Sequence, residues 1–149
     1  MAELTCELLM DASPATIFPF LIDPDLQLRW IGTEAALDPR PGGEYRVLVQ
    51  GKHPGVGEFV EVVPDTKVVF TFGWDELDHP IPAGSTEIEI TLIPDGDKTR
   101  VRLVHRGLPD DALKDHSSGW SHYLERLAVA SAGGDPGPDA SSDDASDES

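Results

Sequence analysis

The sequence contains little that could cross-link the chain or hold a metal. Its 149 residues include one cysteine, Cys6, so no disulfide can form within the chain, and a reducing cytoplasm fits. The HExxH and CxxC patterns of common zinc sites do not occur, and no EF-hand calcium loop is present. Gly-x-Ser-x-Gly and phosphate-binding glycine loops are also missing. We therefore expect no metal and no other cofactor.

Basic residues and long apolar runs are scarce as well. Lys and Arg total 11 against 28 Asp and Glu, which gives a formal net charge of −17. Such a surface repels phosphates, so nucleic acid is not an expected partner. No apolar run approaches the ~20 residues that a membrane helix needs, and the first residues lack the pattern of a signal peptide. We expect neither a membrane span nor export.

The length suits one domain with a real core. We assign it to residues 1–132 and expect residues 133–149 to form a disordered acidic tail. That tail consists of Gly, Pro, Ser, Ala and acidic residues, with no Lys or Arg. It offers too little apolar surface to offset the entropy lost on ordering.

Most of the domain alternates between apolar and polar residues, which is the pattern of antiparallel strands with one wet face. The alternation begins at 3–10 and resumes after the Pro41-Gly42-Gly43 turn. It continues through 44–50, 58–63, 67–74, 86–92 and 99–106. We place turns at 51–55, 64–65 and 94–97, and a long loop at 75–84.

Two helical regions interrupt or follow these strands. Ser13-Pro14 and Asp23-Pro24 each combine an N-cap residue with a helix-starting proline, which predicts two short helices after the first strand. Pro19 should kink or break the first of them. Near the end of the domain, Trp120, Tyr123, Leu124 and Leu127 share one face of a long last helix.

This order of elements resembles the helix-grip (START-like, SRPBCC) superfamily, and within it the AHSA1-like family of Hsp90-ATPase-activator homologues. The resemblance covers about residues 3–130 and rests on order and spacing rather than on any single motif. It is carried by Ser13-Pro14 with Ile17-Phe18, Trp30, Pro41–Tyr45, Gly57–Pro64, Val69–Trp74 and His116–Trp120. It implies an α+β fold in which a curved antiparallel sheet of six to seven strands grips the C-terminal helix around a cavity. Many relatives bind hydrophobic small molecules, and some are cyclases, dehydratases or hydrolases.

Aromatic and histidine side chains on the inward face are the candidate ligand-binding residues, because large aromatic side chains suit an apolar or aromatic ligand. The alternative for each is that it fills the core. The set is Trp30, Tyr45, Phe59, Phe70, Phe72, Trp74, His105, His116, Trp120 and Tyr123.

His105 and Glu58 are the candidate catalytic residues. His105 is on the inward register of the last strand, where a neutral imidazole could act as a general base. It could equally be a hydrogen-bonded structural residue. Glu58 would qualify as an acid or base only if it points inward, toward His105 or Arg46.

Three functions stay open at this point. A binder of a small hydrophobic or aromatic molecule requires a mainly apolar cavity. An acid–base enzyme acting on a polyketide-like substrate requires His105, Glu58 or Tyr45 to converge across that cavity. A chaperone-cofactor or stress-response interaction module requires a collapsed cavity and an exposed apolar patch. Either a monomer or a homodimer is compatible with the exposed strand edges.

Overall fold

The structure is a computed structural model that describes residues 2–49, 53–76 and 81–136. These ranges hold the expected domain apart from residues 1, 50–52 and 77–80. Most of the expected acidic tail, from residue 137 onward, lies outside the described residues, as does part of the expected loop at 75–84.

Within the described ranges, seven antiparallel strands form one sheet, in the order β1-β7-β6-β5-β4-β3-β2. The first strand pairs with the last, and every other pair joins strands that follow one another in the chain. The strands are β1 (Ala2–Met10), β2 (Glu34–Leu37), β3 (Glu44–Val49), β4 (His53–Val63), β5 (Lys67–Phe72), β6 (Thr86–Asp95) and β7 (Lys98–Leu108). This is the helix-grip arrangement that the sequence predicts.

Three helices of four residues each connect β1 to β2: α1 (Pro14–Ile17), α2 (Pro19–Ile22) and α3 (Pro24–Gln27). Each begins with a proline. Proline has no backbone N–H, and the N–H at the first position of a helix has no partner within the helix, so nothing is lost there. The Ser13 hydroxyl accepts from Thr16 N at 3.2 Å, and the Asp23 carboxylate accepts from Asp25 N at 2.9 Å. The first expected helix is therefore divided at Pro19 into α1 and α2.

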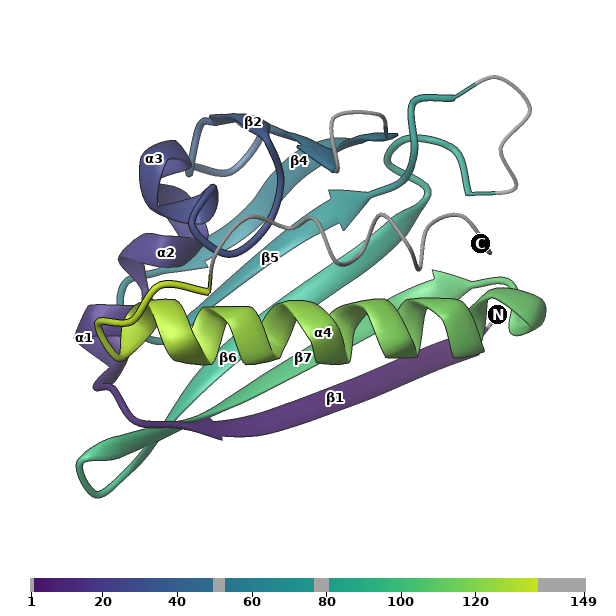
Figure 1. Ribbon diagram of the computed structural model, residues 1–149. Helices are drawn as coiled ribbons and strands as arrows, with labels where there is room; N and C mark the ends of the chain where they lie inside the picture. Colours follow the sequence, from purple (N-terminus) through teal and green to yellow (C-terminus); the bar gives the residue numbers. More distant parts are fainter. Residues whose placement is uncertain (1, 50–52, 77–80, 137–149) are drawn as a thin grey trace.

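The long helix α4 (Leu113–Ser131) follows a short 3-10 turn, η1 (Asp110–Ala112), and lies across the face of the sheet (Figure 1). All four residues of its expected apolar face are buried, and Leu127 is completely inaccessible. They pack on the inward side chains of the sheet, such as Ile88, Ile90 and Leu103. The small helices α1 to α3 lie beside the C-terminal end of α4 (Figure 1), so the core is closed by helices on one side and by the sheet on the other.

Two local features differ from the sequence prediction. Strand β2 was not expected, since Glu34–Leu37 is short and half exposed. The turn expected at 51–55 is wrong for residues 53–55, because β4 already begins at His53 and Pro54 pairs with Leu48, and its first two residues lie outside the described ranges. Gly55 lies within this strand. The Phe72 ring packs where its side chain would be, since a Cβ there would lie 2.6 Å from Phe72 Cε1, so the position requires glycine.

Gly119 gives a direct test of how far α4 extends. It lies inside the helix, and a Cβ built on it meets no atom within 4 Å. Gly119→Ala should therefore stabilise the protein by about 1 kcal/mol, because alanine loses less backbone entropy in a helix. Urea unfolding followed by circular dichroism measures the change. Equal or lower stability would show that the helix does not run through this position.

Candidate ligand-binding site

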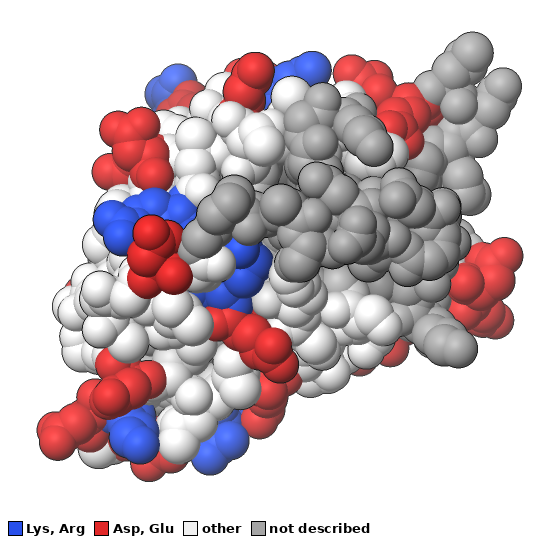
Figure 2. Space-filling view, in the orientation of Figure 1, with Lys and Arg blue, Asp and Glu red and all other residues white. Residues whose placement is uncertain are grey.

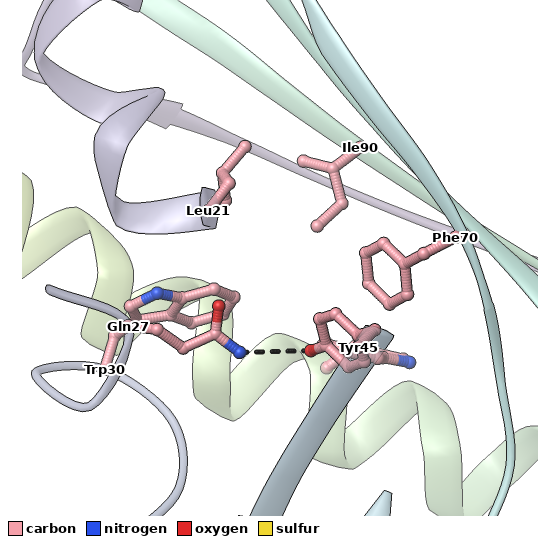
Figure 3. A pocket seen from close by; sticks show the side chains of 7 residues that line it. Leu21, Gln27, Trp30, Tyr45, Phe70 and Ile90 are labelled. Carbon is pink, nitrogen blue, oxygen red and sulfur yellow. Dashed lines mark hydrogen bonds between the residues drawn. The ribbon is translucent and has the colours of Figure 1, made fainter. Parts of the chain in front are cut away.

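Side chains from six parts of the chain converge on one space between the sheet and the helices, which we call the central pocket (Figure 3). Four of the seven are aromatic or indole rings, and one, Gln27, carries an amide. The lining residues are Leu21, Gln27, Trp30, Tyr45, Phe70, Ile90 and Trp120. The sheet contributes one wall, α4 another, and the α2–α3 region the third.

The central pocket is closed. The side chains that line it leave no space for a water molecule. Its floor is a ring stack, in which Tyr45 lies on Phe70 with centroids 4.0 Å apart and planes 14° from parallel. Tyr45, Phe70 and Trp30 are each 3 % exposed or less. The site is therefore an apolar seam between closely packed side chains, without room for a small molecule.

One polar pair lies within this seam. The Gln27 amide nitrogen donates to the Tyr45 hydroxyl at 3.1 Å, and both residues are buried. Burial, opposed in part by the Gln27 hydrogen bond, raises the pKa of Tyr45 to about 12. The phenol thus stays neutral at ordinary pH, and the pair supplies hydrogen-bonding groups without a charge.

His105 belongs to a second polar group just behind Trp120. Trp120 Nε1 donates to His105 Nδ1 at 3.1 Å, so this network assigns the ring proton to Nε2, 2.8 Å from Thr86 Oγ1. The Thr86 hydroxyl in turn donates to the Phe72 carbonyl at 2.6 Å. Both ring nitrogens are therefore occupied within the protein, and the imidazole holds α4 to β5, β6 and β7.

The electrostatics of His105 agree with this structural role. Its side chain is fully buried, and the His116 ring lies 5.5 Å away, centroid to centroid. Burial, together with His116, lowers the pKa of His105 to about 3. The ring is neutral at ordinary pH, and the geometry gives it no free nitrogen with which to accept a substrate proton.

Trp30 and Arg126 fasten the helical wall to α4. Trp30 Nε1 donates to the Phe20 carbonyl at 2.9 Å, and Arg126 Nε donates to the Trp30 carbonyl at 2.9 Å. Arg126 Nη1 also reaches the Pro136 carbonyl at 3.3 Å. The first two of these hydrogen bonds hold a segment that otherwise consists of four-residue helices, which are marginal alone.

The other predicted ligand-binding residues surround the central pocket without lining it. Phe59 and Phe72 pack edge-on against Tyr45, at 5.7 and 6.2 Å between centroids. Trp74 is half-buried and packs on Phe72. Tyr123 is buried on α4 and His116 is beside His105. Of the ten predicted residues, Trp30, Tyr45, Phe70 and Trp120 line the pocket.

Glu58 is exposed on β4, beside the buried Phe59 but on the opposite face. The structure does not bring Glu58, His105 and Tyr45 together. Leu21, Gln27 and Ile90 line the pocket but were not among the candidates. Ile90 follows the inward alternation of its strand, whereas no sequence signal marks Gln27, a polar residue between two leucines.

Elsewhere in the described parts of the chain, little suggests another chemistry. No group of three or more His, Cys, Asp or Glu side chains there is arranged to hold a metal. None of the described helices is long and apolar enough to span a membrane. In Figure 2 acidic and basic side chains intermingle on the face that carries α4, and the coloured residues form no continuous basic surface.

A curved antiparallel sheet closed over a long C-terminal helix, with an aromatic seam between them, defines this as a helix-grip protein. The chain belongs to the family described as Activator of Hsp90 ATPase homolog 1-like protein, whose model matches residues 11–132. Comparison with curated proteins gives no match.

Solved structures of this type are numerous. An AHSA1-like protein from Rhizobium etli is 44% identical, with a TM-score of 0.73 over 93% of this chain and 86% of that one. The Aha1 dimer from Colwellia psychrerythraea and an Hsp90 activator from Plasmodium falciparum are each 19% identical. Their TM-scores are 0.75 and 0.70, over 87% of this chain and 96% of theirs. At that identity the likeness concerns the fold alone.

Proposed function

We propose that this protein binds a small hydrophobic or aromatic molecule between the sheet and the C-terminal helix. The observation that carries the proposal is the convergence of Trp30, Tyr45, Phe70 and Trp120, from four separate segments, on the central pocket. Aromatic walls of this kind are typical of sites for apolar ligands.

Because the pocket is closed, binding requires an opening step. The sheet wall is fixed by strand pairing on both sides of β5 and β6. The α2–α3 wall is not part of the sheet; it is held by the Trp30 and Arg126 hydrogen bonds and by buried side chains such as Leu21. We therefore propose that α2 and α3 move away from the sheet, and that the open form is a minor state which ligand selects.

One observation favours the interaction-module hypothesis. That hypothesis requires a collapsed cavity, and the central pocket has no space for a water molecule. It also requires an exposed apolar patch. The large exposed hydrophobic residues among those described are Leu9, Val60 and Val129, which belong to β1, β4 and α4. Scattered residues of this kind are ordinary, so ligand binding accounts for more of the site. We keep the cytoplasm as the proposed location, and monomer or homodimer as the proposed states.

A binding experiment with naphthalene and phenanthrene tests the proposal. Saturation-transfer NMR should detect binding of at least one of these hydrocarbons to the wild-type protein. Leu21→Trp, which fills the pocket from its movable wall, should weaken that binding at least tenfold. Leu9→Trp adds the same ring at a position that is 42% exposed and should leave the affinity unchanged. If neither these hydrocarbons nor their hydroxyl derivatives bind, or if both variants behave alike, the central pocket is not a ligand site.

A further inference from the structure

The hydrogen-bonding capacity of Gln27 and Tyr45 is only partly used. A carboxamide offers two N–H donors and one carbonyl acceptor, and a phenol offers one donor and an acceptor. The one side-chain hydrogen bond that the described residues give this pair, from Gln27 Nε2 to the Tyr45 oxygen, occupies one donor and one acceptor. The Gln27 carbonyl oxygen, the second Gln27 N–H and the Tyr45 proton remain available.

These remaining groups face the central pocket rather than solvent. Gln27 is 1% exposed and Tyr45 is 3% exposed. Figure 3 shows the amide oxygen of Gln27 turned toward the space between Leu21 and Tyr45. No volume in the pocket is large enough for a water molecule to complete the hydrogen bonds. Gln27 and Tyr45 satisfy each other in part, as buried polar groups normally do, and what they could offer a ligand is the unused hydrogen-bonding capacity of each.

We infer that the ligand is a neutral molecule with a flat apolar body and one hydroxyl group, held by Gln27 and Tyr45 together. A hydroxyl donates one hydrogen bond and accepts another, so it can donate to the Gln27 oxygen and accept from the Tyr45 hydroxyl at once. A ketone could accept from the Tyr45 proton or the second Gln27 N–H, but it has no proton to donate and would leave the Gln27 oxygen unpaired. This inference rests on the proposed function of the central pocket.

The same residues argue against a carboxylate ligand. None of the seven lining residues is Lys, Arg or His. Arg126, a buried cation on α4, already donates to two backbone carbonyls. A carboxylate entering the seam would lose its hydration without meeting a positive charge, which is costly. Fatty acids and similar anions should therefore be rejected in favour of alcohols or phenols.

The walls set the shape of the apolar part. Phe70 and Tyr45 stack almost in parallel, with 14° between their planes. Ile90 lies beside them on the neighbouring strand (Figure 3). A flat ring system can lie along such a surface with full contact, whereas a flexible chain would lose more conformational entropy on binding.

Matched probes separate the hydroxyl inference from the binding proposal. Isothermal titration at neutral pH would compare naphthalene, naphthol and naphthoate, or the corresponding phenanthrene series, on the wild-type protein. We expect the hydroxyl compound to bind about tenfold more tightly than the hydrocarbon, as one good hydrogen-bond set allows. The carboxylate should bind more weakly than the hydroxyl compound. Gln27→Leu and Tyr45→Phe should each bring the ratio of the hydrocarbon and hydroxyl dissociation constants close to one.

The outcomes are distinct. A hydrocarbon that binds as tightly as its hydroxyl derivative overturns the inference and leaves the binding proposal standing. A carboxylate that binds as tightly as the hydroxyl compound also overturns it. Failure of all probes on the wild-type protein overturns the proposed function and the inference with it. Because both side chains act on one hydroxyl, the double variant should lose no more of the preference than either single one.

Discussion

Phe70→Ala should lower the free energy of unfolding by about 3–5 kcal/mol, which is the usual cost of removing a buried aromatic ring. Phe70 is 2% exposed, stacks on Tyr45 and packs edge-on against Phe59. The vacated volume adjoins the central pocket, so the surrounding rings lose contacts on the side where they are already least supported. Urea unfolding at constant pH measures the loss.

Two comparisons sharpen this test. Val60→Ala on β4 truncates a side chain that is 47% exposed and should change stability by less than about 0.5 kcal/mol. Phe70→Leu keeps most of the volume and should cost clearly less than alanine, which protects the experiment if the alanine variant fails to fold. The alanine variant should also bind benzene, since apolar cavities made in this way stay dry. A loss below about 1 kcal/mol would contradict the packing described for Phe70.

Acid should destabilise the protein through His105. In the unfolded chain a histidine takes up a proton below its ordinary pKa of about 6.5, whereas burial holds the pKa of folded His105 near 3. Between these values the unfolded state binds more protons, so stability falls as the pH falls. The slope is about 1.4 kcal/mol per pH unit, or about 3 kcal/mol between pH 7 and pH 4.

His105→Gln isolates this contribution, because glutamine can both donate and accept a hydrogen bond but does not titrate. The measurement is the free energy of unfolding at several values between pH 4 and pH 7, for both proteins. The carboxylates titrate in both, so they cancel in the difference between the two curves. The variant should be less stable at pH 7 yet lose less stability toward pH 4. Parallel curves would mean that His105 is protonated in the folded protein or reaches water.

His105 would also link stability to the ligand entry proposed above. Trp120 is a wall of the central pocket and is also held by His105 Nδ1. Protonation of His105 would place a donor against the Trp120 N–H, which cannot accept. Loss of this hydrogen bond would release the indole. The position of Trp120 in the pocket wall therefore depends on His105 being neutral.

The sequence by itself determined the kind of fold and the side on which its core would form. Alternation assigned the inward faces of β6 and β7 correctly, including Ile88, Ile90 and His105. Helical spacing assigned the buried face of α4, and cap-plus-proline pairs placed the starts of the helices between β1 and β2. These are local regularities, in which each side chain direction follows from the repeat of its own segment.

Only the tertiary structure decided what those inward residues meet. The sequence alone left His105 as either a base or a structural residue, because its hydrogen-bond partners belong to other segments of the chain. The structure shows those partners, Thr86 and Trp120, at the two ring nitrogens. Gln27 carries no periodic signal, yet a four-residue helix turns it against Tyr45, eighteen positions later. The closure of the central pocket likewise depends on rings from β3 and β5 stacking face to face. Periodicity predicts which way a side chain points, whereas contacts between distant segments determine what it can do.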